Sequence, residues 1–323
     1  FVYATAEWAA CRAKDRDASH SVQGQSDKWH WENTPVVLIT PSEYSRAGLL
    51  QCGVPPQQVV VIPNGIDAAV FKPAAAADRD EFRASLGWSD KFVYLNVGAL
   101  TDNKGIKDLL KAFAAVHAQH PNTILVLKGS DNLYPSLELA VREAHKAGLS
   151  LEDMLESTAV QYIKDPMSAA SLALLYSAAD LYVSPYRAEG FNMPVLEAAA
   201  CGVPVVVTRG GPTDEFTHSS FTLYIDSNLQ RVSTKPRNDE LPGHPLKWLV
   251  PDVDHLQELM LFVLTEAGSS FLSNAKQVAP SFVHANYSWK KIALQYLDLV
   301  LSHISSDSAH ISSDSAHISS DSA

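Results

Sequence analysis

The sequence has only three cysteines, Cys11, Cys52 and Cys201, and no two of them have the spacing of a metal-binding or redox pair. This spacing supports neither a zinc site nor a disulfide framework, so we expect the three cysteines to be small buried side chains. No apolar run approaches the roughly 20 residues of a membrane-spanning helix. No basic segment followed by an apolar one opens the chain. The sequence therefore predicts a cytoplasmic protein without a transmembrane segment.

Positive charge is also scarce, since 25 Lys and Arg face 36 Asp and Glu and the formal net charge is −11. An acidic balance argues against a surface that wraps nucleic acid or an anionic membrane. The chain is 46% hydrophobic, which is ordinary for a globular protein with a sizeable core. Any phosphate that the protein binds must therefore be met by a local site.

The end of the chain lacks apolar mass, because it consists of three head-to-tail copies of HISSDSA at 303–309, 310–316 and 317–323. We expect residues 301–323 to stay solvated and disordered. Residues 1–65 contain a polar, strand-poor stretch and are too few for a domain with its own core. Residues 66–300 remain for one complete domain, which closes with two C-terminal helices.

Short β-branched runs alternate with segments of helical periodicity along the chain. Unbroken apolar runs are typical of parallel strands covered on both faces, and the helical segments DLLKAFAAVHAQH and SAASLALLYSAAD supply crossovers. The pattern predicts an α/β fold, a doubly wound Rossmann-like parallel sheet. The expected strands are VVLIT (36–40), VVVI (59–62), FVYLNVG (92–98), TILVLKGS (123–130), VQYI (160–163), LYVSP (181–185), PVVVT (204–208) and TLYI (222–225).

The segment YVSPYRAEGFNMPVLEAAACGVPVVVT (182–208) reads as a strand, a glycine-containing loop, a helix with Pro194 in its first turn, and a second strand. The free N–H groups at such a helix start, with the helix dipole, hold phosphates or sugar hydroxyls. Glu189 lies in the loop and Glu197 eight positions later, so both carboxylates can face one crevice. Two simpler readings stay open. Glu197 stabilises its own helix as a first-turn carboxylate, or Glu189 forms a solvated ion pair with Arg187.

Lys104 follows the strand at 92–98 in a glycine loop, where an ammonium group can neutralise a diphosphate without a metal. Its alternative reading is an exposed loop lysine. Three Asp-x-Asp triplets begin at Asp15, Asp78 and Asp252, but none has the strand-end setting of a metal site, and Asp252 suits a helix cap. We expect no metal and no cofactor. The chain has no P-loop, GxGxxG or Ser-His-Asp pattern, which disfavours kinases, dehydrogenases and hydrolases.

EGFNMPVLE has the E-x7-E form of the family 4 retaining glycosyltransferases, and the AxxxGVPVVVT strand follows it as in that family. Further segments resemble the family in the same order: PSEYSR (41–46) with CGVPPQQVVVIPNGID (52–67), NVGALTDNKGIKDLLKAFA (96–114), TRGGPTDEF (208–216) and YSWKKIALQYL (287–297). The resemblance covers roughly residues 35–300. It implies a GT-B architecture, in which residues 1–65 are a remnant of the first domain with its linker and residues 66–300 form the nucleotide-sugar donor domain.

The resemblance also implies roles for individual residues. Glu189 would bind hydroxyls of the donor sugar, Glu197 the nucleotide ribose, and Lys104 the diphosphate. Glu189 and Lys104 are thus the expected catalytic residues. The residues expected to bind the donor are Gly98, Lys104, Ile163, Glu189, Gly190, Phe191, Asn192, Met193 and Glu197.

The expected function is a retaining, metal-independent transfer of a sugar from a UDP-, GDP- or ADP-sugar to an unknown acceptor hydroxyl. One departure is Ala99, where the family commonly has an arginine, and the loss of one such donor costs about 2.7–4 kcal/mol of transition-state stabilisation. Lys128 and Arg209 are candidate substitutes. Two alternatives are kept open: a nucleotide-sugar-binding module without turnover, and a GT-B nucleotide-sugar epimerase.

Overall fold

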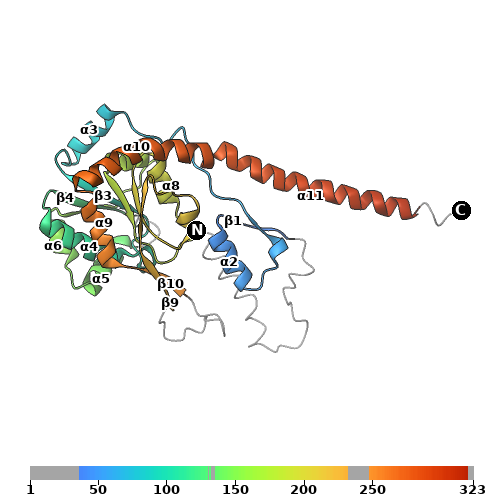
Figure 1. Ribbon diagram of the computed structural model, residues 1–323, viewed down its shortest axis with the longest axis horizontal. Helices are drawn as coiled ribbons and strands as arrows, with labels where there is room; N and C mark the ends of the chain where they lie inside the picture. The colour runs from blue at the N-terminus through green and yellow to red at the C-terminus, as the bar shows by residue number, and fades with distance from the viewer. Residues whose placement is uncertain (1–35, 130, 132–134, 232–246, 319–323) are drawn as a thin grey trace.

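The computed structural model describes residues 36–129, 131, 135–231 and 247–318. The polar stretch predicted before residue 35 and the last five residues lie outside this part of the chain. Figure 1 shows a body built on one large sheet, a smaller unit beside it that contains α2 (Glu43–Gln51), and a long helix leading to the C-terminus.

The large sheet has six strands in the order β5-β4-β3-β6-β7-β8, and all its pairings are parallel. The chain first moves outward from β3 to β5 and then returns to the other side of β3 with β6. The two halves of the sheet therefore meet between β3 and β6, which is the topological switch point of a doubly wound fold. The strands are β3 (Phe92–Val97), β4 (Thr123–Lys128), β5 (Val160–Ile163), β6 (Leu181–Ser184), β7 (Val205–Thr208) and β8 (Thr222–Ile225).

Helices cover both faces of the sheet, so the strands contribute alternate side chains to two cores. In β3, Val93 and Leu95 pack with residues of α7, α8 and α10, whereas Tyr94 packs with α4, α5 and α9. The helices are α3 (Ala76–Ser85), α4 (Ile106–Gln119), α5 (Ser136–Lys146), α6 (Leu151–Glu156), α7 (Ala169–Ala178), α8 (Met193–Ala200), α9 (Val253–Phe262) and α10 (Glu266–Tyr287).

The predicted fold class and all eight predicted strands are confirmed. The sequence did not predict the antiparallel pair β9 (Ser227–Arg231) and β10 (Lys247–Pro251), because most residues of β9 are exposed and polar. Among the helices, α2, α3, α5, α6 and α10 were not predicted, and three helices, not two, follow Pro251. Helix α10 contains Pro280, and α3 has only one buried residue, which explains why neither gave a clear amphipathic signal.

The smaller unit consists of β1 (Leu38–Thr40), α2, the 3₁₀ turn η3 (Pro56–Gln58) and β2 (Val59–Val61). Its two strands are parallel and cover a small cluster of Leu49, Val54 and Val59. The following linker is anchored to the large domain, because Ile66 pairs with the junction of α10 and α11. A Cβ on Gly65 would lie 2.6 Å from the Trp289 ring, so only glycine fits there.

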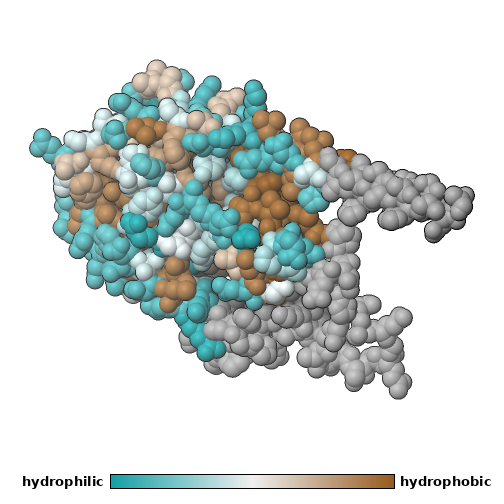
Figure 2. All heavy atoms as spheres, turned by 45° about the vertical axis from the view of Figure 1, so that its right-hand side comes forward, coloured by the Kyte–Doolittle hydropathy of each residue, from teal (hydrophilic) through white to brown (hydrophobic). Residues whose placement is uncertain are grey.

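Helix α11 (Trp289–Ile318) continues through residues 301–318, where the sequence led us to expect a disordered tail. The repeats contain neither glycine nor proline, so nothing in them ends a helix that has already started. Figure 2 shows apolar side chains gathered near the point where α11 leaves the body, and large exposed ones include Leu294 and Leu297. Among the residues that the structure describes, no helix combines the length and the hydropathy of a membrane span.

One cysteine prediction is wrong. Cys201 is a free, buried side chain as expected, but Cys52, at the end of α2, is disulfide-bonded. Cysteine spacing in the sequence does not report which thiols the fold brings together.

Candidate functional site

The candidate site lies at the switch point, where the loop after β3 meets the loop after β6. The two loops are held together by Asn103, whose carbonyl accepts the N–H groups of Arg187 at 2.8 Å and Ala188 at 3.3 Å. The two loops also approach each other closely at Gly105, where an added Cβ would lie 1.9 Å from the carbonyl oxygen of Pro185. Gly105 also has a φ of 70°, which glycine adopts without strain. Residues far apart in sequence are thus fixed side by side at the carboxyl edge of the sheet.

This arrangement brings together the two residues predicted to be catalytic. The ammonium group of Lys104 donates to Oε1 of Glu189, and both side chains are mostly buried. Arg187, which the simpler reading made the partner of Glu189, does not bind it. Its guanidinium group binds Asp108 at 2.6 Å and Asp102 at 3.5 Å instead. The reading of Glu189 as a solvated ion pair with Arg187 is therefore wrong, as is the reading of Lys104 as a freely exposed lysine.

The loop that begins at Gly190 leads into α8, whose first residue is Met193. Within the described part of the chain, the N–H groups of the four residues 190–193 have no hydrogen-bond acceptor. The backbone of Asn192 is left-handed, with a φ of 76°, and its side chain donates to the Ser184 hydroxyl at 3.0 Å. The Phe191 ring stacks on Phe216, so this residue offers only its backbone to the site. Free amides beside a helix start can hold anions or hydroxyl oxygens.

Glu197 lies in the second turn of α8 rather than the first, so the simple helix-dipole reading does not hold. The Tyr176 hydroxyl donates to its Oε2 at 2.8 Å. Burial raises the pKa of Glu197, while the hydrogen bond from Tyr176 acts in the opposite direction. Burial is the largest cause that raises the pKa of Tyr182, and the charges of Glu189 and Glu197 act in the same direction.

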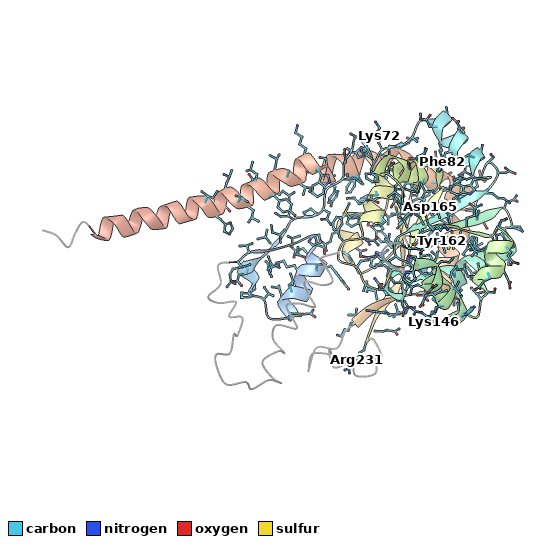
Figure 3. The ribbon with its side chains drawn as sticks, turned by 180° about the vertical axis from the view of Figure 1, so that it is seen from behind. Lys72, Phe82, Lys146, Tyr162, Asp165 and Arg231 are labelled. Atoms are coloured by element: carbon cyan, nitrogen blue, oxygen red, sulfur yellow. The ribbon has the colours of Figure 1, made fainter. Side chains whose placement is uncertain are left out.

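The other predicted donor-binding residues lie along the same edge of the sheet. Gly98 directly follows β3 with a φ of 147°, and a Cβ placed there would lie 3.9 Å from the Lys104 side chain. Ile163 ends β5, two strands away, and is partly buried against the core. Figure 3 labels its neighbours Tyr162, on the edge strand β5, and Asp165, just after that strand.

The two candidate substitutes for the missing arginine differ. The Arg209 guanidinium lies over the Tyr224 ring at 4.5 Å and is half exposed, on the side of β8. Lys128 ends β4, next to β3, and its ammonium group donates to the Gly129 carbonyl. Burial lowers the pKa of Lys128, while the charges of Asp165 and Asp131 oppose that shift. Lys128 is therefore the nearer of the two to the loop that carries Lys104.

Two features of the site had no signal in the sequence. Tyr176, the partner of Glu197, stands in a run of apolar residues and reads as core. Asn103, which fastens the two loops, reads as an ordinary loop residue. An open groove of about 960 Å³ lies elsewhere, lined by residues of the linker, α3 and α7 that include Lys72 and Phe82 (Figure 3). No group of three or more His, Cys, Asp or Glu in the described ranges is placed to hold a metal ion.

The structure is thus a Rossmann-like, doubly wound domain, whose switch point carries a lysine, two carboxylates and a row of free amides, groups that suit anions and hydroxyls. Residues 78–231 match the family model described as "Glycosyl transferases group 1". The motifs at 96–114 and 182–208 fall inside this match, and the resemblance to glycosyltransferases stated from them is confirmed. Over these residues the chain is similar to the group 1 glycosyltransferases.

The chain is also similar to curated proteins, among them several D-inositol 3-phosphate glycosyltransferases. The D-inositol 3-phosphate glycosyltransferase of Kineococcus radiotolerans is 34% identical over 185 residues, which are 54% of this chain and 40% of that protein. The mannosylfructose-phosphate synthase of Agrobacterium fabrum is 31% identical over 178 residues, or 54% of this chain and 38% of that protein. The chain thus spans about two fifths of the length of these relatives.

Solved structures show the same fold. Anabaena HepE in complex with UDP-glucose has a TM-score of 0.65 at 18% identity, covering 84% of this chain and 65% of that one. Sucrose-phosphate synthase from Thermosynechococcus elongatus has a TM-score of 0.64 at 23% identity, covering 92% and 66%. These neighbours have the GT-B fold that the sequence motifs implied.

Proposed function

We propose that this protein is a retaining, metal-independent glycosyltransferase that moves a sugar from a nucleoside-diphosphate donor to an acceptor hydroxyl. The observation that carries the proposal is the Lys104–Glu189 pair beside the four free amides of residues 190–193. Such a site offers a cation and N–H donors for a diphosphate and a carboxylate for sugar hydroxyls. The relatives named as glycosyltransferases and the neighbour that binds UDP-glucose support this choice.

The proposed reaction divides the work among these groups. Glu189 accepts hydrogen bonds from hydroxyls of the donor sugar and orients its ring, while Glu197 does the same for the ribose. The bond between the sugar C1 and the phosphate oxygen breaks, and its electron pair leaves with the diphosphate. Lys104 and the loop amides nearest the start of α8 stabilise that negative charge, while the amides next to Glu189 line the sugar. The acceptor oxygen forms the new bond on the same face, and its proton goes to the departing phosphate oxygen.

The donor can be identified by thermal shift with UDP-glucose, GDP-mannose and ADP-glucose, since a ligand that binds only the folded state raises Tm. Lys104→Ala is expected to lower kcat for transfer by roughly 100-fold, the loss typical of one donor to a developing oxyanion. Glu189→Gln should reduce sugar transfer and leave the affinity for the free nucleoside diphosphate nearly unchanged. Lys111→Ala, which removes an exposed lysine of α4, is the matched control.

Wild-type protein whose Tm does not respond to any of the three donors would contradict the proposed function. Binding without transfer would favour the second candidate, a nucleotide-sugar-binding module without turnover. That candidate is favoured by Ala99, since the Arg187 guanidinium is held by Asp102 and Asp108 and the Arg209 guanidinium lies over the Tyr224 ring. Conversion of the donor sugar without any acceptor would indicate an epimerase instead.

A further inference from the structure

The start of α2, in the smaller unit, lies directly on the loop that carries Glu189. The hydroxyl groups of Ser42 and Ser45 both donate to the carbonyl oxygen of Gly190, at 2.7 Å and 3.0 Å. Both serines are almost fully buried. Ser42 at the same time accepts the N–H of Ser45 at 3.0 Å as the N-cap of α2, so the direction of each hydrogen bond is fixed. Two hydroxyls from α2 thus occupy both lone pairs of one loop carbonyl.

A carboxylate from the large domain also binds the start of α2. Glu215, at the end of the 3₁₀ turn η5 (Pro212–Glu215), accepts the N–H groups of Glu43 and Tyr44, each at 2.8 Å. A helix leaves its first N–H groups without internal partners and carries partial positive charge there. Glu215 satisfies the first two of these groups and Ser42 the third. The docking of α2 is therefore shared between a charged cap and the serine pair.

This docking fixes the orientation of one peptide in the loop. The peptide between Gly190 and Phe191 is planar and trans, so its N–H points opposite to its carbonyl group. Since the carbonyl is held by α2, the Phe191 N–H is directed away from α2, and it has no acceptor among the described residues. Without α2, rotation of this peptide would redirect one of the four free amides.

We propose that Ser42, Ser45 and Glu215 are positioning residues, which dock α2 and hold the Gly190–Phe191 peptide in the orientation that binds the sugar end of the donor. The identity of the ligand rests on the proposed function, but the effect of α2 on the loop does not. The docking of α2 couples the smaller unit to the donor site. Changes in these three residues should therefore affect the sugar more than the nucleotide.

The loop effect is measured without ligand, by amide hydrogen exchange of residues 188–193 and 43–50. Ser45→Ala and Glu215→Ala should speed exchange in both segments, and Glu215→Gln, which keeps one acceptor oxygen, should fall between wild type and Glu215→Ala. Two variants serve as controls and should match wild type. Ser85→Ala removes an exposed hydroxyl that bonds within its own helix, and Glu258→Gln neutralises an exposed carboxylate of α9.

The ligand effect is measured by calorimetry with the donor that wild type binds and with the matching free nucleoside diphosphate. Ser45→Ala should weaken binding of the nucleotide sugar by about 2- to 10-fold, the effect of one neutral hydrogen bond. Binding of the nucleoside diphosphate should change less than that. Equal weakening of both ligands would overturn the proposal, because it would mean general loosening of the domain.

Unchanged exchange at 188–193 in Ser45→Ala and Glu215→Ala would also overturn the proposal, whether or not α2 itself exchanges faster. If wild type binds no nucleotide sugar, the proposed function fails, and exchange at 188–193 alone then decides whether α2 positions this loop.

Discussion

Replacing Gly105 by alanine tests whether the close approach of the two site loops holds the domain together. The new Cβ would lie 1.9 Å from the Pro185 carbonyl oxygen, about 1.5 Å inside ordinary contact, so the loops must separate. Separation strains or breaks the hydrogen bonds from the N–H groups of Arg187 and Ala188 to Asn103. Each costs about 1 kcal/mol, and the left-handed backbone at residue 105 adds about 1–2 kcal/mol for alanine. The expected destabilisation is about 3–4 kcal/mol.

The free energy of unfolding in urea, with Tm as a second readout, measures this loss, and about 3 kcal/mol corresponds to roughly 6–12 °C. Gly148→Ala is the matched control, because Gly148 has a φ of 74° but nothing within 4 Å of its added Cβ. The loss of unfolding free energy in Gly148→Ala therefore measures the strain of the left-handed backbone alone. If Gly105→Ala costs no more than Gly148→Ala, the loops are not tightly joined there, and the reasoning is refuted. Binding of the donor sugar should be lost together with stability, because Lys104 and Glu189 lie on the two separated loops.

Glu197→Gln should weaken donor binding yet stabilise the fold at pH 7, because the amide avoids a buried charge and still accepts the Tyr176 hydroxyl. Burial raises the pKa of Glu197, so the free energy of unfolding of wild type falls as the pH rises above 4.5, the ordinary pKa of this carboxyl group. In urea unfolding experiments, the stability advantage of the variant over wild type should therefore vanish below that pH. A stability advantage that grew on acidification would contradict this prediction. Arg187→Met leaves buried Asp108 without its partner and should lower the free energy of unfolding by about 3–5 kcal/mol. The double variant with Asp108→Asn should recover much of this loss. A double variant as unstable as Arg187→Met would show that the broken ion pair is not the cause.

Much of the fold could be predicted from the sequence, because a buried parallel strand needs an unbroken apolar run. Val205 to Val207 face the two cores in alternation, so both faces of β7 demand apolar residues and the run appears in the chain. The pair β9 and β10 gave no such signal, since Leu229 is exposed and its neighbours in β9 are polar. Helix α10 was missed because Pro280 interrupts the pattern that a helix interior normally shows.

The candidate site was predictable in its residue types but only partly in its contacts. The loop, the helix start and the two carboxylates could be placed at one edge from local patterns alone. Their partners could not. Arg187 stands two residues from Glu189 but binds Asp108, and Glu189 binds Lys104, 85 residues away. Local spacing says which side chains are available, while the crossing of two loops decides which of them meet.

The sequence by itself determined the doubly wound architecture, the strand–loop–helix at 182–208 and the lysine loop, because each depends on neighbours along the chain. The tertiary structure alone decided three things: that Lys104 pairs with Glu189, that Tyr176 supports Glu197, and that α2 rests on the Gly190 carbonyl. These contacts join segments 21 to 148 residues apart. The order of the strands across the sheet brings such segments together, and a local pattern in the chain does not encode that order.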